Sequence, residues 1–366
     1  MIDRRLLTSF DWKILLLVIF IASVGVFNIY SASASYSIAG TSYAVKQFYW
    51  IIIGLGLLLV VCSVDYHLLE DVSYWFYGIL LVFLLLVLLV GRTSMGATRW
   101  LHLGFFSMQP SEPMKIVIII TFARYFARRQ PPGGLGFREI ALPMAILSAP
   151  ALLIMKQPDL GTAIMVCLVA GTITLAVGVR WNVLISMLLA SIPVLYVSWH
   201  YLLRSYQKNR VLNFLNPERD PLKSGYHLIQ SKIAVGSGGL TGKGFLQGTQ
   251  SQLRFLPEQH TDFAFSVFAE EWGFWICMAM LLLYLSLILW GLHVASRCND
   301  RFGSLLAVGV TAMLFWHIVI NMGMVIGLFP VVGVPLPFFS YGGTSMITSM
   351  IGAGILLNIS MRRFMF

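Results

Sequence analysis

The chain has 366 residues, of which 58% are hydrophobic and only 11% are charged, and its formal net charge is +10. Ordinary soluble domains carry roughly 25% charged residues, so this composition excludes an ordinary soluble domain. Basic loops beside anionic lipid headgroups explain the positive charge, and we therefore expect no nucleic acid partner. The four cysteines lie in or near apolar stretches, and their spacing predicts neither a disulfide framework nor a metal site.

About ten stretches are apolar and long enough to cross a bilayer, which takes about 20 residues each. They lie near 12–31, 45–64, 72–91, 111–128, 139–156, 160–179, 181–202, 264–296, 304–329 and 342–361. The sequence therefore predicts an all-α fold, a polytopic transmembrane helical bundle of about ten spans. It forms a single membrane domain over residues 1–366, with one large extracytoplasmic loop between spans seven and eight.

The arginines indicate how the bundle is oriented, because basic residues gather at the cytoplasmic ends of spans. With ten spans, one side of the membrane holds Arg4, Arg5, Arg124, Arg128, Arg129, Arg138, Arg180, Arg297, Arg301, Arg362 and Arg363. We therefore expect both termini to be cytoplasmic. The turn at 65–71 does not fit this pattern, because it is acidic and yet falls on the same side.

Further charged residues lie on the other side of the membrane, at the extracytoplasmic ends of spans four to six. Arg99 lies in the loop before span four, where it suits a phosphate or a lipid headgroup. Glu112 and Lys115 are three residues apart at the head of that span, so they occupy neighbouring helix positions. They form either a self-satisfied ion pair or the lining of a polar pocket. Asp159, in the tight turn between spans five and six, suits a turn and a helix cap.

The segment 203–262 is a basic loop of about sixty residues in an otherwise apolar chain. A loop of that length in a compact protein is usually functional or disordered. Residues 227–235 predict a short interfacial helix with Lys232 on its polar side. Residues 236–244, which are glycine-rich and end near Lys243, are either an anion-binding backbone turn or a flexible tight turn.

Acidic residues mark the border between this loop and span eight. Asp262 suits a general base, kept ionised by hydration and basic neighbours, and also the cap of the helix that follows, and the two roles do not exclude each other. His260 is either a proton relay or a surface residue. Glu270 and Glu271 follow on the same expected helix, and we expect one of them to pair with Arg254 or a lysine.

The last loop, 333–345, is uncharged and rich in proline and glycine. Such irregular backbone is tolerated at a membrane edge only where it is buried in protein or lines a cavity. Together with four other motifs it resembles the SEDS family (shape, elongation, division and sporulation), and in particular its elongation branch. The five motifs are 96–100, 109–112 with Lys115, 157–162, 256–263, and 330–337 leading to 340–343.

The resemblance implies a peptidoglycan glycosyltransferase that polymerises lipid II on the outer face of the bacterial cytoplasmic (inner) membrane. It also implies a class B penicillin-binding protein, a transpeptidase, as partner, together with other elongasome membrane proteins. The essential aspartate of the family falls on Asp262, and the polar pair of its central cavity falls on Glu112 and Lys115.

The chemistry would then be a single inverting displacement that forms a β-1,4 bond, with Asp262 taking the proton of the acceptor hydroxyl. The departing pyrophosphate needs cations around it. The candidates are Arg210, Lys232, Lys243, Lys115 and Arg99, and Asp159 and His260 complete the set of candidate substrate-binding residues. No cofactor is expected, and a divalent cation is left open. Two alternatives are a lipid II flippase and a non-catalytic elongasome scaffold.

Overall fold

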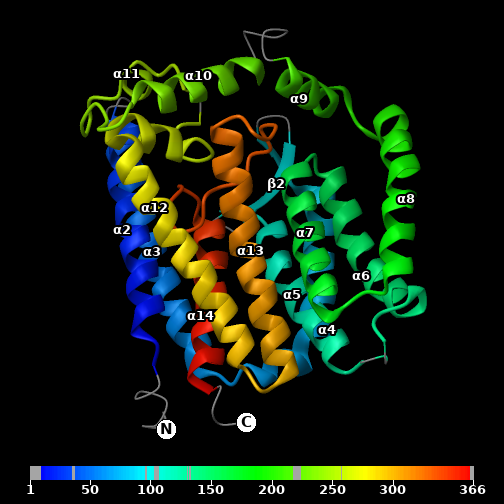
Figure 1. Cartoon of the computed structure of the whole chain (residues 1–366). Helices are drawn as coiled ribbons and strands as arrows, with labels where there is room; N and C mark the ends of the chain where they lie inside the picture. The colour runs from blue at the N-terminus through cyan, green and yellow to red at the C-terminus, as the bar shows by residue number, and fades with distance from the viewer. Residues whose placement is uncertain are drawn as a thin grey trace.

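The computed structural model describes residues 10–34, 38–94, 97–102, 107–129, 131, 133–216, 224–256 and 258–362, which form a bundle of long helices (Figure 1). The helices are α2 (Trp12–Ala34), α3 (Ile38–Ser63), α4 (His67–Val90), α5 (Ser111–Ala127), α6 (Phe137–Lys156), α7 (Leu160–Val177), α8 (Trp181–Val197), α12 (Ala264–Arg297), α13 (Arg301–Val325) and α14 (Gly343–Arg362). In the described part of the chain, nine helices are long and apolar enough to span a membrane. The remaining one, α5, has 17 residues and matches the fourth expected span. These helices confirm the predicted polytopic bundle. The segments are helical because an apolar segment in lipid must satisfy its backbone hydrogen bonds internally.

Helices α5, α13 and α14 form the interior of the bundle, whereas α8 stands at its edge (Figure 1). Gly309 of α13 lies so close to α5 that a Cβ atom there would fall 2.4 Å from Ile119 Cγ2. Small residues allow such close approach between helices in a membrane. Polar side chains on these two helices are accordingly buried in protein, namely those of Glu112, Lys115, His317 and Asn321.

The predicted outer loop is largely folded into helices that cross one end of the bundle, which we call the α10 end (Figure 1). A π-helical turn (Ser198–Leu202) precedes the loop, and the loop contains α9 (Ser205–Leu215), α10 (Ser224–Ser237) and α11 (Thr249–Gln252). The short helix expected at 227–235 is confirmed as part of α10.

A small antiparallel sheet, which the sequence analysis did not predict, departs from the all-α expectation. Its strands are β1 (Arg92–Ser94), β2 (Ala97–His102) and β3 (Ser107–Met108), in the order β1-β2-β3. Arg92 pairs with Trp100, and Leu101 pairs with Met108. The strands are too short to show a clear alternating pattern in the sequence. Strand β2 carries Arg99 into the α10 end of the bundle.

The glycine-rich segment 236–244 packs against a break in α12. Gly273 interrupts this helix with φ 72° and ψ −173°, a conformation that favours glycine. The Lys243 amide donates to the Glu270 carbonyl at 3.1 Å, and the Gly244 amide donates to the Glu271 carbonyl at 2.9 Å. The segment thus supplies backbone partners where the helix is broken. The tight turn of the sequence analysis is confirmed, because the Gly242 amide donates to the Gly238 carbonyl at 2.8 Å, and the amides of Lys243 and Gly244 bind α12.

The start of α2 and the end of α14 lie at the opposite end of the bundle (Figure 1). There, the acidic turn that did not fit the orientation contacts two arginines at the end of α5. Arg128 Nε donates to Glu70 Oε1 at 2.7 Å, and Arg124 donates to the carbonyls of Glu70 and Asp71 at 2.6 and 3.0 Å. The carboxylate of Glu70 and the backbone carbonyls of this turn therefore act as partners for the basic end of α5.

Candidate functional site

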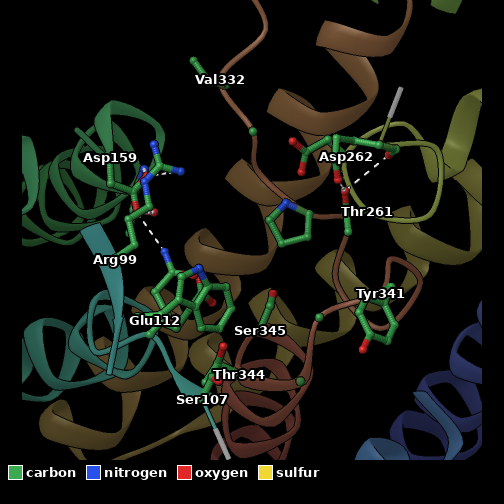
Figure 2. Close-up of a pocket in the computed structure, with 18 of the residues that line it drawn as sticks. Arg99, Ser107, Glu112, Asp159, Thr261, Asp262, Val332, Tyr341, Thr344 and Ser345 are labelled. Atoms are coloured by element: carbon green, nitrogen blue, oxygen red, sulfur yellow. Dashed lines mark hydrogen bonds and ion pairs between the residues drawn. The ribbon is translucent and has the colours of Figure 1, made fainter. Parts of the chain in front are cut away.

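A cavity of about 840 Å³ lies at the α10 end, among α3, α5, α7, α9, α10 and the segments that precede α12 and α14. Figure 2 shows Asp262 on one side of it, Arg99 and Asp159 on the other, and Glu112, Thr344 and Ser345 lower in the same view. The polar and aromatic lining residues include Lys46, Tyr49, Trp50, Arg99, Trp100, Gln109, Glu112, Asp159, Arg210, His227, Glu258, Thr261, Asp262, Tyr341, Thr344 and Ser345.

Asp262 sits in the turn immediately before α12, and it is not the cap of that helix. The N-cap is Phe263, which has no capping side chain, so the capping interpretation is wrong. Among the described residues, the Asp262 carboxylate forms no hydrogen bond or ion pair. Its backbone carbonyl accepts a 3.0 Å hydrogen bond from Asn321 Nδ2, which also donates to Val334 O at 2.7 Å. Asn321 therefore fixes the backbone of Asp262 and leaves its side chain for the cavity.

The electrostatic surroundings make Asp262 a stronger base than an ordinary aspartate. Burial raises its pKa from 3.8 to about 6, and the negative charge of Glu258 adds to this rise. Arg210 and Arg99 act in the opposite direction. At pH 7 a group with such a pKa is still about 90% ionised. The sequence analysis attributed the ionised form to hydration and to basic neighbours. The first part was wrong, because protein surrounds this half-buried side chain and raises its pKa, but the second part is confirmed by the effect of Arg210 and Arg99.

Asp159 and Arg99 form the facing wall, and most of the hydrogen-bonding capacity of Asp159 is occupied. Asp159 caps α7, as expected, and it accepts hydrogen bonds from Thr162 Oγ1 at 2.9 Å and from Gln109 Nε2 at 2.8 Å. Arg99 Nη1 lies 3.8 Å from Asp159 Oδ1, and Arg99 Nη2 donates to the carbonyl of Pro158. Asp159 therefore holds the wall together, while Arg99 brings a positive charge to the cavity.

Glu112 and Lys115 form an ion pair at the cavity wall, with Lys115 Nζ 2.8 Å from Glu112 Oε1. Glu112 lines the cavity, and Lys115 is buried behind it. Both interpretations of this pair were therefore partly right. On its other side Lys115 Nζ lies 2.8 Å from His317 Nε2 of α13. Within the described part of the chain, Glu112 Oε2 is buried without a hydrogen-bond partner.

The structure brings some of the predicted basic residues to the cavity and places others elsewhere. Arg210 lines the cavity from α9. Lys243 is not among the residues that line the cavity. Its Nζ instead binds Glu270 Oε1 at 2.7 Å and Thr249 Oγ1 at 2.9 Å. The expectation that a lysine pairs with one of the two glutamates of α12 is thereby confirmed. Lys232 also lies outside the cavity lining, with its side chain against Gly327 just after α13.

His260 is likewise not among the lining residues. Its ring lies 4.6 Å from that of Tyr43 and 5.7 Å from that of Tyr341, and its carbonyl accepts a 3.0 Å hydrogen bond from the Tyr341 amide. Burial lowers the pKa of His260, although Glu258 opposes this. His260 therefore supports Tyr341, which does line the cavity.

The sequence analysis missed Lys46, His227 and His317. A signal existed for His317, which stands four residues before Asn321 and so on the same face of its helix. No comparable signal marks Lys46 or His227, because only the fold brings α3 and α10 to the cavity. Across the described residues, no group of three or more histidine, cysteine, aspartate or glutamate side chains is arranged to hold a metal ion.

Fold and site together define a polytopic helical membrane protein with a polar, carboxylate-bearing cavity at one end of the bundle. The model of the FtsW, RodA and SpoVE family, described as cell cycle protein, matches residues 11–364, and the chain belongs to this family.

The relatives agree with this placement. The peptidoglycan glycosyltransferase MrdB of Escherichia coli strain K12 is 42% identical over 342 residues, which cover 92% of this chain and 91% of that protein. The peptidoglycan glycosyltransferase RodA of Treponema pallidum is 34% identical and covers 98% of this chain and 99% of its own.

Solved structures show the same fold. A chain of a peptidoglycan synthase complex that coordinates polymerization and crosslinking superposes with a TM-score of 0.83 at 30% identity, covering 98% of this chain and 99% of its own. The rod shape determining protein RodA of Thermus thermophilus gives 0.71 at 28% identity, covering 97% and 98%.

Proposed function

We infer that this membrane protein is a peptidoglycan glycosyltransferase, and we propose that Asp262 is the general base of its reaction. The observation that carries this assignment is the state of the Asp262 carboxylate. It lines a cavity of about 840 Å³, makes no hydrogen bond to the described residues, and has a pKa of about 6. A base is most effective when its pKa lies near the working pH.

The proposed reaction is a single displacement between two lipid II-type substrates. Asp262 accepts the proton of the 4-hydroxyl of the acceptor sugar as that oxygen bonds to C1 of the donor sugar. The bond from C1 to the lipid pyrophosphate breaks, and the pyrophosphate leaves with the electron pair. Attack from the opposite face inverts an α-linked donor into a β-1,4 product. Pyrophosphate is a good leaving group, so a second carboxylate acting as general acid is not required.

The cations of the cavity support this chemistry. Arg99 and Arg210 both line the cavity that Asp262 faces, and Lys46 adds a third positive charge from α3. Preorganised cations stabilise the charge that develops on a departing pyrophosphate. We therefore keep Arg99 and Arg210 as pyrophosphate ligands, and replace Lys232 and Lys243 with Lys46.

The test is polymerisation of lipid II by the purified protein carrying Asp262→Asn, which preserves side-chain shape but removes the charge. We expect polymer formation to fall by at least about a hundredfold, as for loss of a general base. The matched control is Asp71→Asn, which removes an exposed carboxylate at the other end of the bundle. Normal polymer from Asp262→Asn would refute the assignment. Movement of labelled lipid II across vesicles without polymer would favour the flippase alternative.

We also propose a protein partner, and the support for it comes from a structural relative. One structural relative belongs to a complex that coordinates polymerization with crosslinking, which supports a class B penicillin-binding protein as the transpeptidase partner here. If the catalytically inactive Asp262→Asn variant restored rod shape to cells depleted of the protein, the scaffold alternative would gain support.

We further propose that the α10 end faces outward from the bacterial inner membrane and that both termini are cytoplasmic. The concentration of arginines at the end that holds the start of α2 supports this orientation. In a variant without native cysteines, a membrane-impermeant maleimide applied to intact spheroplasts should label Leu253→Cys and spare Asp71→Cys. The reverse pattern would overturn the orientation.

A further inference from the structure

His317 of α13 occupies a defined position behind the cavity wall. Its side chain is buried, with Nδ1 2.7 Å from the carbonyl oxygen of Met313 and Nε2 2.8 Å from Lys115 Nζ. A carbonyl oxygen can only accept, so Nδ1 carries the proton and donates to it. The lone pair of Nε2 then accepts a hydrogen bond from the Lys115 ammonium. The ring is therefore neutral and held in one tautomer.

Lys115 is consequently held from two sides. Its side chain is 1% exposed, and its ammonium donates to Glu112 Oε1 on one helix and to His317 on another. A buried ammonium that lost the imidazole would seek another acceptor, because an unpaired buried charge is unfavourable. Glu112 Oε2 is such an acceptor, because it belongs to the carboxylate that Lys115 already contacts and has no partner among the described residues.

We propose that His317 is a positioning residue: it holds Lys115 against Glu112 Oε1, and so keeps Oε2 available to accept a hydrogen bond from a sugar hydroxyl or amide N–H in the cavity. Two observations carry this proposal, the two-sided contact of Lys115 and the unpartnered buried oxygen on a residue that lines the cavity. The proposal rests on the function assigned above and names one further determinant of substrate binding.

The experiment is a double-mutant cycle read out as binding of fluorescent lipid II to protein that carries Asp262→Asn and therefore does not turn over. Relative to that parent, His317→Leu should weaken binding by about tenfold, as for loss of one hydrogen bond to a charged acceptor. His317→Gln retains an acceptor and should bind within about threefold of the parent. When Lys115→Met is also present, His317→Leu should change binding by less than about twofold, since no ammonium remains to be held.

Equal weakening by His317→Leu with and without Lys115→Met would overturn the proposal, because His317 would then act independently of Lys115. His317→Gln binding as weakly as His317→Leu would also overturn it. If His317→Leu does not fold, His317→Phe replaces it, since it fills the ring volume and lacks the acceptor.

The same cycle separates this proposal from the assigned function. If the wild-type protein binds lipid II without forming polymer, the glycosyltransferase assignment is refuted, but the binding measurements of the double-mutant cycle can still be interpreted. A failed cycle in a protein whose polymerisation depends on Asp262 would refute only the role of His317. In the active protein, His317→Leu should raise KM more than it lowers kcat, whereas a global structural defect would mainly reduce the active fraction.

Discussion

Replacing Glu258 by glutamine should shift the pH dependence of polymerisation in a direction that the structure fixes. Asp262 must be ionised to accept a proton, so kcat/KM should fall as the pH drops through the Asp262 pKa of about 6. The negative charge of Glu258 helps to raise that pKa. Its removal should therefore lower the pKa of Asp262 and move the acid limb of the profile to lower pH.

The size of the shift follows from the order of the causes. The pKa of Asp262 rises from 3.8 to about 6, burial is the larger cause and Glu258 the second. Glu258→Gln should therefore lower the pKa of Asp262 by about 0.5 to 1 pH unit, which is less than burial contributes. At pH 5.5 this would increase the ionised fraction of Asp262 by about two- to threefold. At pH 8 the fraction is nearly complete in both proteins, so this charge effect should vanish.

The assay is kcat/KM for lipid II polymerisation between pH 5 and 8.5, because this ratio reports ionisation of the free enzyme. Glutamine can still accept the hydrogen bond that Thr261 Oγ1 donates to Glu258 Oε2 at 3.3 Å, so the local turn should persist. Arg210→Gln is the opposite-sign control, because Arg210 lowers the pKa of Asp262 and its loss should move the acid limb upward. An acid limb that stays in place or rises in Glu258→Gln would refute the reasoning.

Three further changes test the framework around the site. The pKa of Asp262 is raised on folding from 3.8 to about 6, so stability should decrease as pH rises through this window and stay lower above it. Asp262→Asn should therefore raise the Tm at pH 8, by only a degree or two because the side chain is partly exposed; a lower Tm would contradict this. Gly273→Ala should destabilise by about 3 kcal/mol or more, because its φ is 72° and a Cβ atom would lie 2.2 Å from a backbone nitrogen of the glycine-rich segment. Gly171→Ala, which meets nothing within 4 Å, should leave the thermal melt in detergent nearly unchanged. Lys243→Met should cost about 3 kcal/mol, the lower end of the range for a broken buried ion pair, because the buried Glu270 loses its cation but still accepts hydrogen bonds from Thr249 Oγ1 and Gln250 N; the remaining folded protein should keep its KM for lipid II. A selective rise in KM would instead restore Lys243 as a substrate ligand.

Local patterns made the membrane helices predictable. Apolar runs of about 20 residues must form helices in lipid whatever their neighbours are, so the expected span at 264–296 closely matches α12 (Ala264–Arg297). The turn at Asp159 followed from local rules as well, because a capping side chain contacts its own helix. The short strands carried no such pattern, and the sequence analysis did not find them.

The position of Asp262 in a loop beside span eight was visible in the sequence, but its surroundings were not. Its raised pKa depends on burial by other segments, and this burial outweighs the opposing positive charges of Arg99 and Arg210 from distant parts of the chain. The opposite error occurred at Lys243, whose glycine-rich neighbours suggested an anion. The lysine is in fact neutralised by Glu270, 27 positions away.

The sequence by itself determined that the chain crosses a membrane many times, which segments do so, and that a carboxylate stands at the start of the eighth span. These properties depend on transfer of short segments from water to lipid, and such energies act on each segment separately. Only the tertiary structure decided which partners each buried charge meets. The contact between Lys115 and His317 joins positions 202 residues apart, and the energy of a buried charge depends on its immediate partners, which the packing of the helices selects.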